Sequence, residues 1–201
     1  ALSIYYMRGP QVSLMHISFI VRKITSQIGP SLEMMNYLAA TATMFAIYKD
    51  RWLSRRYLRL AKKVVDVVDD PAVLAKYRTW EMLSYSYLDQ AVASSNIIEA
   101  LLTEHKKDLM PYNLLLVSTT LCTNYVLRGK TTLALSSIDQ MMTPYDRTCT
   151  KVFSCNKTFT EWYKIPSLAF RGEFEEADRI IVNSRAIFAS VDEEIWQIGL
   201  F

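Results

Sequence analysis

The clearest indication of the architecture is a short stretch that the chain contains in two versions. The later version reads Phe170-Arg171-Gly172-Glu173-Phe174-Glu175-Glu176-Ala177, and the earlier one reads Leu127-Arg128-Gly129-Lys130-Thr131-Thr132-Leu133-Ala134. Each places a glycine five residues before an alanine. A glycine ends a helix without the steric penalty of a Cβ atom, and the alanine leaves room for a second helix to pack closely. Both stretches therefore predict the turn of a helical hairpin.

Regularly spaced prolines extend this pattern toward the start of the chain. Pro30, Pro71 and Pro111 are separated by 41 and 40 residues, and each precedes a new apolar periodic run. Proline is tolerated in the first turn of a helix, because its missing N–H would have no partner there. The prolines therefore predict recurring helix starts, with approximate repeats over residues 30–70, 71–110, 111–143 and 158–190.

Apolar side chains at helical spacing divide each block into two helices. In the first block one stripe consists of Leu32, Met35, Leu38, Ala39, Ala42 and Phe45. After a break at Lys49-Asp50, the predicted second stripe consists of Leu53, Tyr57, Leu60, Val64, Val67 and Val68. Because these spacings follow the helical period, each block predicts a pair of antiparallel helices.

At this level of detail the last unit resembles a tetratricopeptide repeat (TPR). The resemblance is carried by Gly172, Phe174 and Ala177, with Trp162, Leu168 and Phe170 before them and Ile181 after them. In that family the glycine, the aromatic residue and the alanine lie at the turn and at the start of the second helix. Gly129 and Ala134 match in part, since Thr131 replaces the aromatic residue, and the two earlier units lack the glycine. The period of 40 to 43 residues also exceeds the family's roughly 34.

Composition agrees with a helical fold. Of 201 residues, 51% are hydrophobic and 21% are charged, which is typical of a folded chain rather than a disordered one. Five glycines and six prolines are too few for the many turns of a β-sandwich or barrel. We therefore predict an all-α fold over 1–201: an α-solenoid of about four antiparallel helical hairpins, TPR-like, with an extra helix near each end. The chain starts at Ala1 rather than at a methionine, and its last residues, 195–201, are mostly apolar. We therefore expect it to be a fragment of a longer protein.

The cysteines and the hydropathy pattern bear on location. Three cysteines, Cys122, Cys149 and Cys155, form no disulfide framework, which favours an intracellular, cytoplasmic protein. Asn156-Lys157-Thr158 matches a glycosylation acceptor and keeps secretion as the alternative. The longest apolar stretch, residues 31–48, contains Glu33 and Asn36, so we expect no membrane span.

The sequence offers little support for catalysis. Gly129-Lys130-Thr131 resembles the end of a phosphate-binding loop, but that motif requires a preceding glycine and strand, and the sequence has Asn124 and a helical pattern instead. The two histidines, His16 and His105, and the cysteines lack the spacing of metal ligands. Acidic clusters fall at predicted helix starts, where negative charge stabilises the helix dipole. We therefore expect no enzyme, no cofactor and no metal in this segment.

The candidate partner-binding residues lie on the helix after Asp50. They are Arg51, Arg55, Arg59, Lys62 and Lys63, with Tyr48 and Trp52 near the start of that helix. Their near-helical spacing predicts one basic face, with Arg56 beside it and Leu53, Leu60, Val64 and Val67 on the opposite side. Such a face could bind an acidic peptide, an anionic membrane surface or nucleic acid, or it could simply be solvated surface.

These observations predict a protein–protein interaction scaffold or regulatory helical-repeat segment that is part of a larger chain or complex. Its partner would be a protein or peptide, and an acidic one if the basic face binds it. One alternative is a domain that senses a peptide or small molecule and regulates an attached effector. The long repeats look like those beside signalling ATPase or cyclase modules. Another alternative is an anionic-surface or nucleic-acid binder that uses the basic helix.

Overall fold

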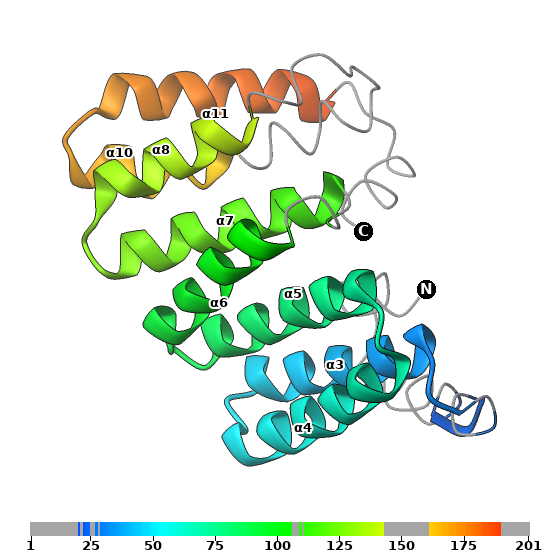
Figure 1. Ribbon diagram of the computed structural model, residues 1–201. Helices are drawn as coiled ribbons and strands as arrows, with labels where there is room; N and C mark the ends of the chain where they lie inside the picture. Colours follow the sequence, from blue (N-terminus) through cyan, green and yellow to red (C-terminus); the bar gives the residue numbers. More distant parts are fainter. Residues whose placement is uncertain are drawn as a thin grey trace. The chain divides into compact units, whose positions relative to one another are not determined.

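A computed structural model describes residues 20, 22–24, 27, 29–105, 109, 111–142 and 161–189. Every regular element in these ranges is a helix, so the all-α prediction is confirmed. The helices are α3 (Leu32–Ile47), α4 (Arg51–Val68), α5 (Pro71–Tyr87), α6 (Ala91–Glu104), α7 (Pro111–Leu127), α8 (Thr131–Met142), α10 (Ile165–Phe170) and α11 (Phe174–Ala189) (Figure 1). The chain divides between Asn113 and Leu114 into two compact units.

Short polar side chains cap the N-termini of α3 and α4. Met34 N donates to Ser31 Oγ at 3.2 Å, and Leu53 N donates to Asp50 Oδ1 at 2.9 Å, which satisfies first-turn N–H groups. Pro71 and Pro111 are the first residues of α5 and α7, as their spacing predicts. Pro30 differs, because it lies one residue before the N-cap Ser31.

Four helix-to-helix turns in the described residues share one backbone geometry. The residues with positive φ in these four turns are Lys49, Asp89, Gly129 and Gly172, which we call the left-handed turn residues. In each turn this residue donates its N–H to the carbonyl three residues earlier, and the next residue donates to the carbonyl five residues earlier, at 2.8–3.1 Å. This is the Schellman arrangement that closes a helix C-terminus. The carbonyl of that next residue also accepts the first hydrogen bond of the following helix, so these four turns are equally short. Asp69, between α4 and α5, also has a positive φ, but its N–H donates to the carbonyl four residues earlier.

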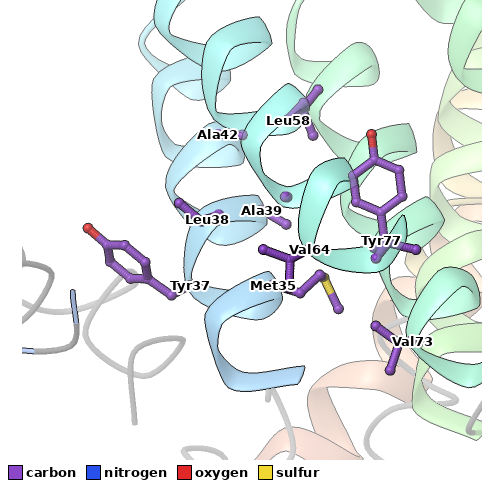
Figure 2. Close-up of a cluster of buried hydrophobic side chains, with 11 residues drawn as sticks. Met35, Tyr37, Leu38, Ala39, Ala42, Leu58, Val64, Val73 and Tyr77 are labelled. Carbon is purple, nitrogen blue, oxygen red and sulfur yellow. The ribbon is translucent and has the colours of Figure 1, made fainter. Parts of the chain in front are cut away.

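The core of the first unit forms where α3, α4 and α5 meet. Met35, Leu38 and Ala42 of α3 lie against Leu58 and Val64 of α4 (Figure 2). Val73 and Tyr77 of α5 complete this cluster. Polar contacts join α3 to α5 as well: the hydroxyls of Thr43 and Ser84 are 2.9 Å apart, and Trp80 Nε1 donates to Asn36 Oδ1 at 3.3 Å. The α3–α4 hairpin is thus fixed to the α5–α6 hairpin by apolar burial and by hydrogen bonds.

The second unit has smaller clusters. Cys122 of α7 packs with Ala134 and Ile138 of α8, and Leu168 of α10 packs with Ala177 and Ile180 of α11. Leu135 of α8 lies against the latter cluster, which links the two hairpins. Both alanines that follow the turn glycines by five residues are buried, whereas Phe174 is 63% exposed.

The predicted apolar stripe of α4 is partly wrong. Leu60 and Val67 are exposed, whereas the buried face is made by Ser54, Leu58, Ala61, Val64 and Val65. Two of these buried residues are small, and they allow α4 to approach its neighbours closely. A prediction from large hydrophobic residues alone therefore gives a buried face that is rotated around α4 from the observed one.

Candidate partner-binding face of helix α4

The structure places the residues of the predicted basic face together on the outer side of α4. Arg51, Arg55, Arg59 and Lys63 are exposed, and Lys62 is half-buried. They share a side because residues three or four apart are neighbours on a helix surface. The two aromatic residues also face solvent: Tyr48, which caps α3, is 54% exposed, and Trp52 is 63% exposed. Large exposed aromatic side chains beside cations are common in binding surfaces.

Most of these cations have no acidic partner within the described residues. Lys62 pairs with Asp66 one turn further along α4. For Arg51, Arg55, Arg56, Arg59 and Lys63, the part of the chain that the structure describes provides no carboxylate within ion-pairing distance. The Arg56 guanidinium instead lies 5.3 Å from the centre of the Trp52 ring, a cation–π arrangement. The face is therefore strongly positive and open to solvent.

Apart from the N-cap Asp50, the charges near the ends of α4 oppose its helix dipole. Helix N-termini favour negative and C-termini favour positive side chains, each by about 0.3–1 kcal/mol. In α4 the first turn contains no acidic residue and starts with Arg51, whereas the last turn contains no basic residue. Asp66 lies in that last turn, and Asp69 follows the helix. The helix dipole therefore does not explain why cations gather on α4.

Apolar side chains alternate with cations along one edge of this face, a feature that the sequence analysis missed. We call this edge the α4 stripe; it consists of Trp52, Arg56, Leu60, Lys63 and Val67. Its residues are separated by four, four, three and four positions, so they form one line along the helix. Leu60 is 39% exposed and Val67 is 68% exposed. The helical spacing is visible in the sequence, but the predicted apolar stripe places Leu60 and Val67 in the core.

Other features of the described residues offer less chemistry. A shallow, open depression of about 480 Å³ lies at the start of α6, lined by Asp89, Gln90, Ala91, Val92, Ala93 and Asn96. The charged group in this lining, Asp89, is paired with Lys49 at 2.8 Å. The Gly129-Lys130-Thr131 segment is a turn between two helices, which removes the strand that a phosphate-binding loop requires.

The buried titratable groups are held in their neutral forms. Cys122 donates its thiol to the Tyr163 carbonyl at 3.2 Å, and burial raises the pKa of this thiol to about 11. Burial is also the main cause that raises the pKa of the Tyr77 hydroxyl, which donates to Glu81 Oε1 at 3.1 Å. A neutral thiol is a poor nucleophile, so Cys122 has a packing role.

Several features of the sequence lie outside the described residues: His16, Cys149, Cys155, the Asn156-Lys157-Thr158 tripeptide and both chain ends. Within the described residues, no helix combines the length and the apolar character that crossing a bilayer demands. Comparison with protein-family models, with curated proteins and with solved structures found no match for this chain. The resemblance to tetratricopeptide repeats accordingly stays a prediction.

Proposed function

We propose that this chain is a protein–protein interaction segment that binds an acidic protein partner through the outer face of α4. In this proposal the hairpins belong to a TPR-like α-solenoid, which serves as a scaffold or regulatory part of a larger protein. The shared turn geometry supports the repeat, because Lys49, Asp89 and Gly129 follow one another at intervals of 40 residues and Gly172 follows after 43. Small buried residues recur five positions after these turn residues, as Ser54, Ser94, Ala134 and Ala177.

The observation that carries the proposal is the set of exposed cations on α4 without acidic partners in the described residues. An arginine side chain presents a rigid fork of N–H donors that matches a carboxylate, and paired contacts of this kind are stronger than neutral hydrogen bonds. Four arginines within nine residues of α4, Arg51, Arg55, Arg56 and Arg59, offer such forks to solvent. A carboxylate-rich partner would supply the counter-charges.

The test is a binding titration of the whole chain with three anionic probes: a glutamate-rich peptide, a single-stranded oligonucleotide and phosphatidylserine vesicles. We expect the peptide to bind and its affinity to fall at least about tenfold in the Arg55→Glu/Arg59→Glu/Lys63→Glu variant, because each reversed charge repels the carboxylates. Added salt should weaken the wild-type interaction, since exposed charges are screened.

A matched control reverses the same number of cations in the second unit. Arg128, Lys130 and Arg185 are exposed, so Arg128→Glu/Lys130→Glu/Arg185→Glu changes the net charge equally without altering α4. If both triple variants lose peptide binding to the same extent, the binding reflects net charge and the proposed face is wrong. If the oligonucleotide or the vesicles bind α4 more tightly than the peptide does, the partner is a nucleic acid or a membrane and the proposed protein partner is wrong.

A further inference from the structure

The spacing of the apolar residues in the α4 stripe indicates the secondary structure of the partner, just as the cations indicate its charge. The apolar members Trp52, Leu60 and Val67 are separated by eight and seven residues, or about 12 Å and 10 Å along the helix axis. Seven residues is close to two turns of any α-helix, so a partner helix aligned with α4 would present its own apolar residues at the same intervals. An extended strand or an irregular loop has no such repeat.

From this match we infer that the partner docks on the α4 stripe as an acidic amphipathic helix. The inference rests on the proposed function and adds the secondary structure and the side-chain pattern of the ligand. Its apolar residues would cover Trp52, Leu60 and Val67, and its flanking carboxylates would meet Arg56 and Lys63 within the stripe and Arg55 beside it. α4 has 18 residues, about 27 Å, which is enough for several turns of such a helix.

Charge excludes a second copy of α4 as the occupant. A symmetric contact between two α4 helices would place Arg56 and Lys63 opposite the same residues of the other copy. Like charges across an interface cost several kcal/mol, so the partner helix must carry the opposite charge. The described part of α4 provides Asp66 alone as an exposed acid, and Asp66 pairs with Lys62.

The interleaving of the stripe argues against a membrane. Helices that lie on a bilayer collect their apolar residues on one face and their cations on the other. In the α4 stripe, Arg56 stands between Trp52 and Leu60, and Lys63 stands between Leu60 and Val67. If the apolar residues entered the acyl chains of a bilayer, these two cations would also have to move toward the hydrocarbon, which is unfavourable for a charge. A nucleic acid would match the cations but would leave Leu60 and Val67 without apolar contacts.

The experiment compares two peptides of identical composition, rich in glutamate and leucine and as long as α4. In one, leucines recur at every third and fourth position, so that the peptide is amphipathic when helical; in the other the same residues are scrambled. We expect the amphipathic peptide to bind the whole chain at least about tenfold more tightly and to gain helical circular dichroism on binding.

Two double variants then locate the contact. Trp52→Ser/Val67→Ser removes exposed apolar groups from the α4 stripe and should abolish the preference for the amphipathic peptide. Phe170→Ser/Val182→Ser removes an exposed aromatic residue and an exposed valine from the second unit and should leave that preference unchanged. Because all four side chains are exposed, we expect the thermal melting of both variants to stay close to that of the wild type.

The outcomes separate this inference from the proposed function. If both peptides bind equally and the Arg55/Arg59/Lys63 reversal weakens both, the acidic partner stands and the helical docking is overturned. If neither peptide binds, the proposed function fails together with the inference. If the apolar double variant of α4 keeps the full preference for the amphipathic peptide, the helix docks elsewhere and the α4 stripe is not its site.

Discussion

Ser54 and Ser94 occupy the same place in successive hairpins but differ in one hydrogen bond. Both are fully buried five residues after a left-handed turn residue. Ser94 Oγ donates to the Met82 carbonyl at 2.8 Å, whereas Ser54 Oγ has no hydrogen-bond partner among the described residues. An unpaired buried hydroxyl costs about 1–3 kcal/mol, and a satisfied one contributes about 1 kcal/mol. We therefore expect Ser54→Ala to raise the free energy of unfolding and Ser94→Ala to lower it, each by about 1 kcal/mol. Urea titrations of both variants measure this, and equal effects of the same sign would contradict the assignment.

The left-handed turn residues give a second prediction at this scale. A Cβ atom on Gly172 would meet no atom within 4 Å, so the cost of Gly172→Ala comes from backbone strain at φ +77°. We expect a loss of about 1 kcal/mol in unfolding free energy, and a smaller loss for Gly172→Asn, because asparagine tolerates this conformation. Lys49→Gly should instead raise the unfolding free energy, because glycine relieves the backbone strain at this position. The loss of the exposed ion pair between Lys49 and Asp89 should make this gain smaller. An unchanged midpoint for Gly172→Ala in thermal melts would show that the turn relaxes.

At the scale of the element, α4 combines a stability defect with a binding surface. Arg51 at its first position opposes the helix dipole, so Arg51→Glu should raise the unfolding free energy by about 0.3–1 kcal/mol. The same change should weaken binding of the glutamate-rich peptide, because it removes one cation and adds an anion. Parallel melting and binding measurements on this variant provide the test. Loss of both stability and binding would mean that Arg51 has a structural role.

The same helix shows what the sequence can and cannot predict. Proline positions and the Lys49-Asp50 break locate the helices, because they mark where hydrogen bonding along the helix must stop. The buried side of α4 could not be read correctly, because close packing favours Ser54 and Ala61 over the larger Leu60 and Val67. The left-handed backbone of Lys49 and Asp89 could not be predicted from residue type, since neither is a glycine. The signal that the sequence offers is the interval of 40 residues from Lys49 to Asp89 and again from Asp89 to Gly129.

For the whole molecule, buried acids make stability depend on alkaline pH. A group whose pKa is raised by folding stabilises the folded state below its unfolded pKa, and this contribution disappears as the pH rises through the folded value. For Cys122 that window runs from its ordinary pKa of 9.0 to about 11, and the loss amounts to about 2 kcal/mol by pH 11. Burial raises the pKa of Tyr37 and Tyr77 as well, which adds to the loss. We expect Cys122→Ala to be less stable at pH 8 but less sensitive to pH between 8 and 11. Equal pH sensitivity in urea titrations would contradict a buried, neutral thiol.

The short turns also restrict how a gene for such a chain can change in length. In each of these four turns, the carbonyl of the residue after the left-handed one already accepts the first hydrogen bond of the next helix, so the turn contains no spare position. Each inserted or deleted residue would rotate the following helix by about 100° relative to its neighbours. A single-codon insertion after Lys49 would thus turn the buried side of α4 toward water and its charged side toward α3. Length variation among descendants of this chain should therefore occur by gain or loss of whole hairpins, and tags should be kept out of these turns.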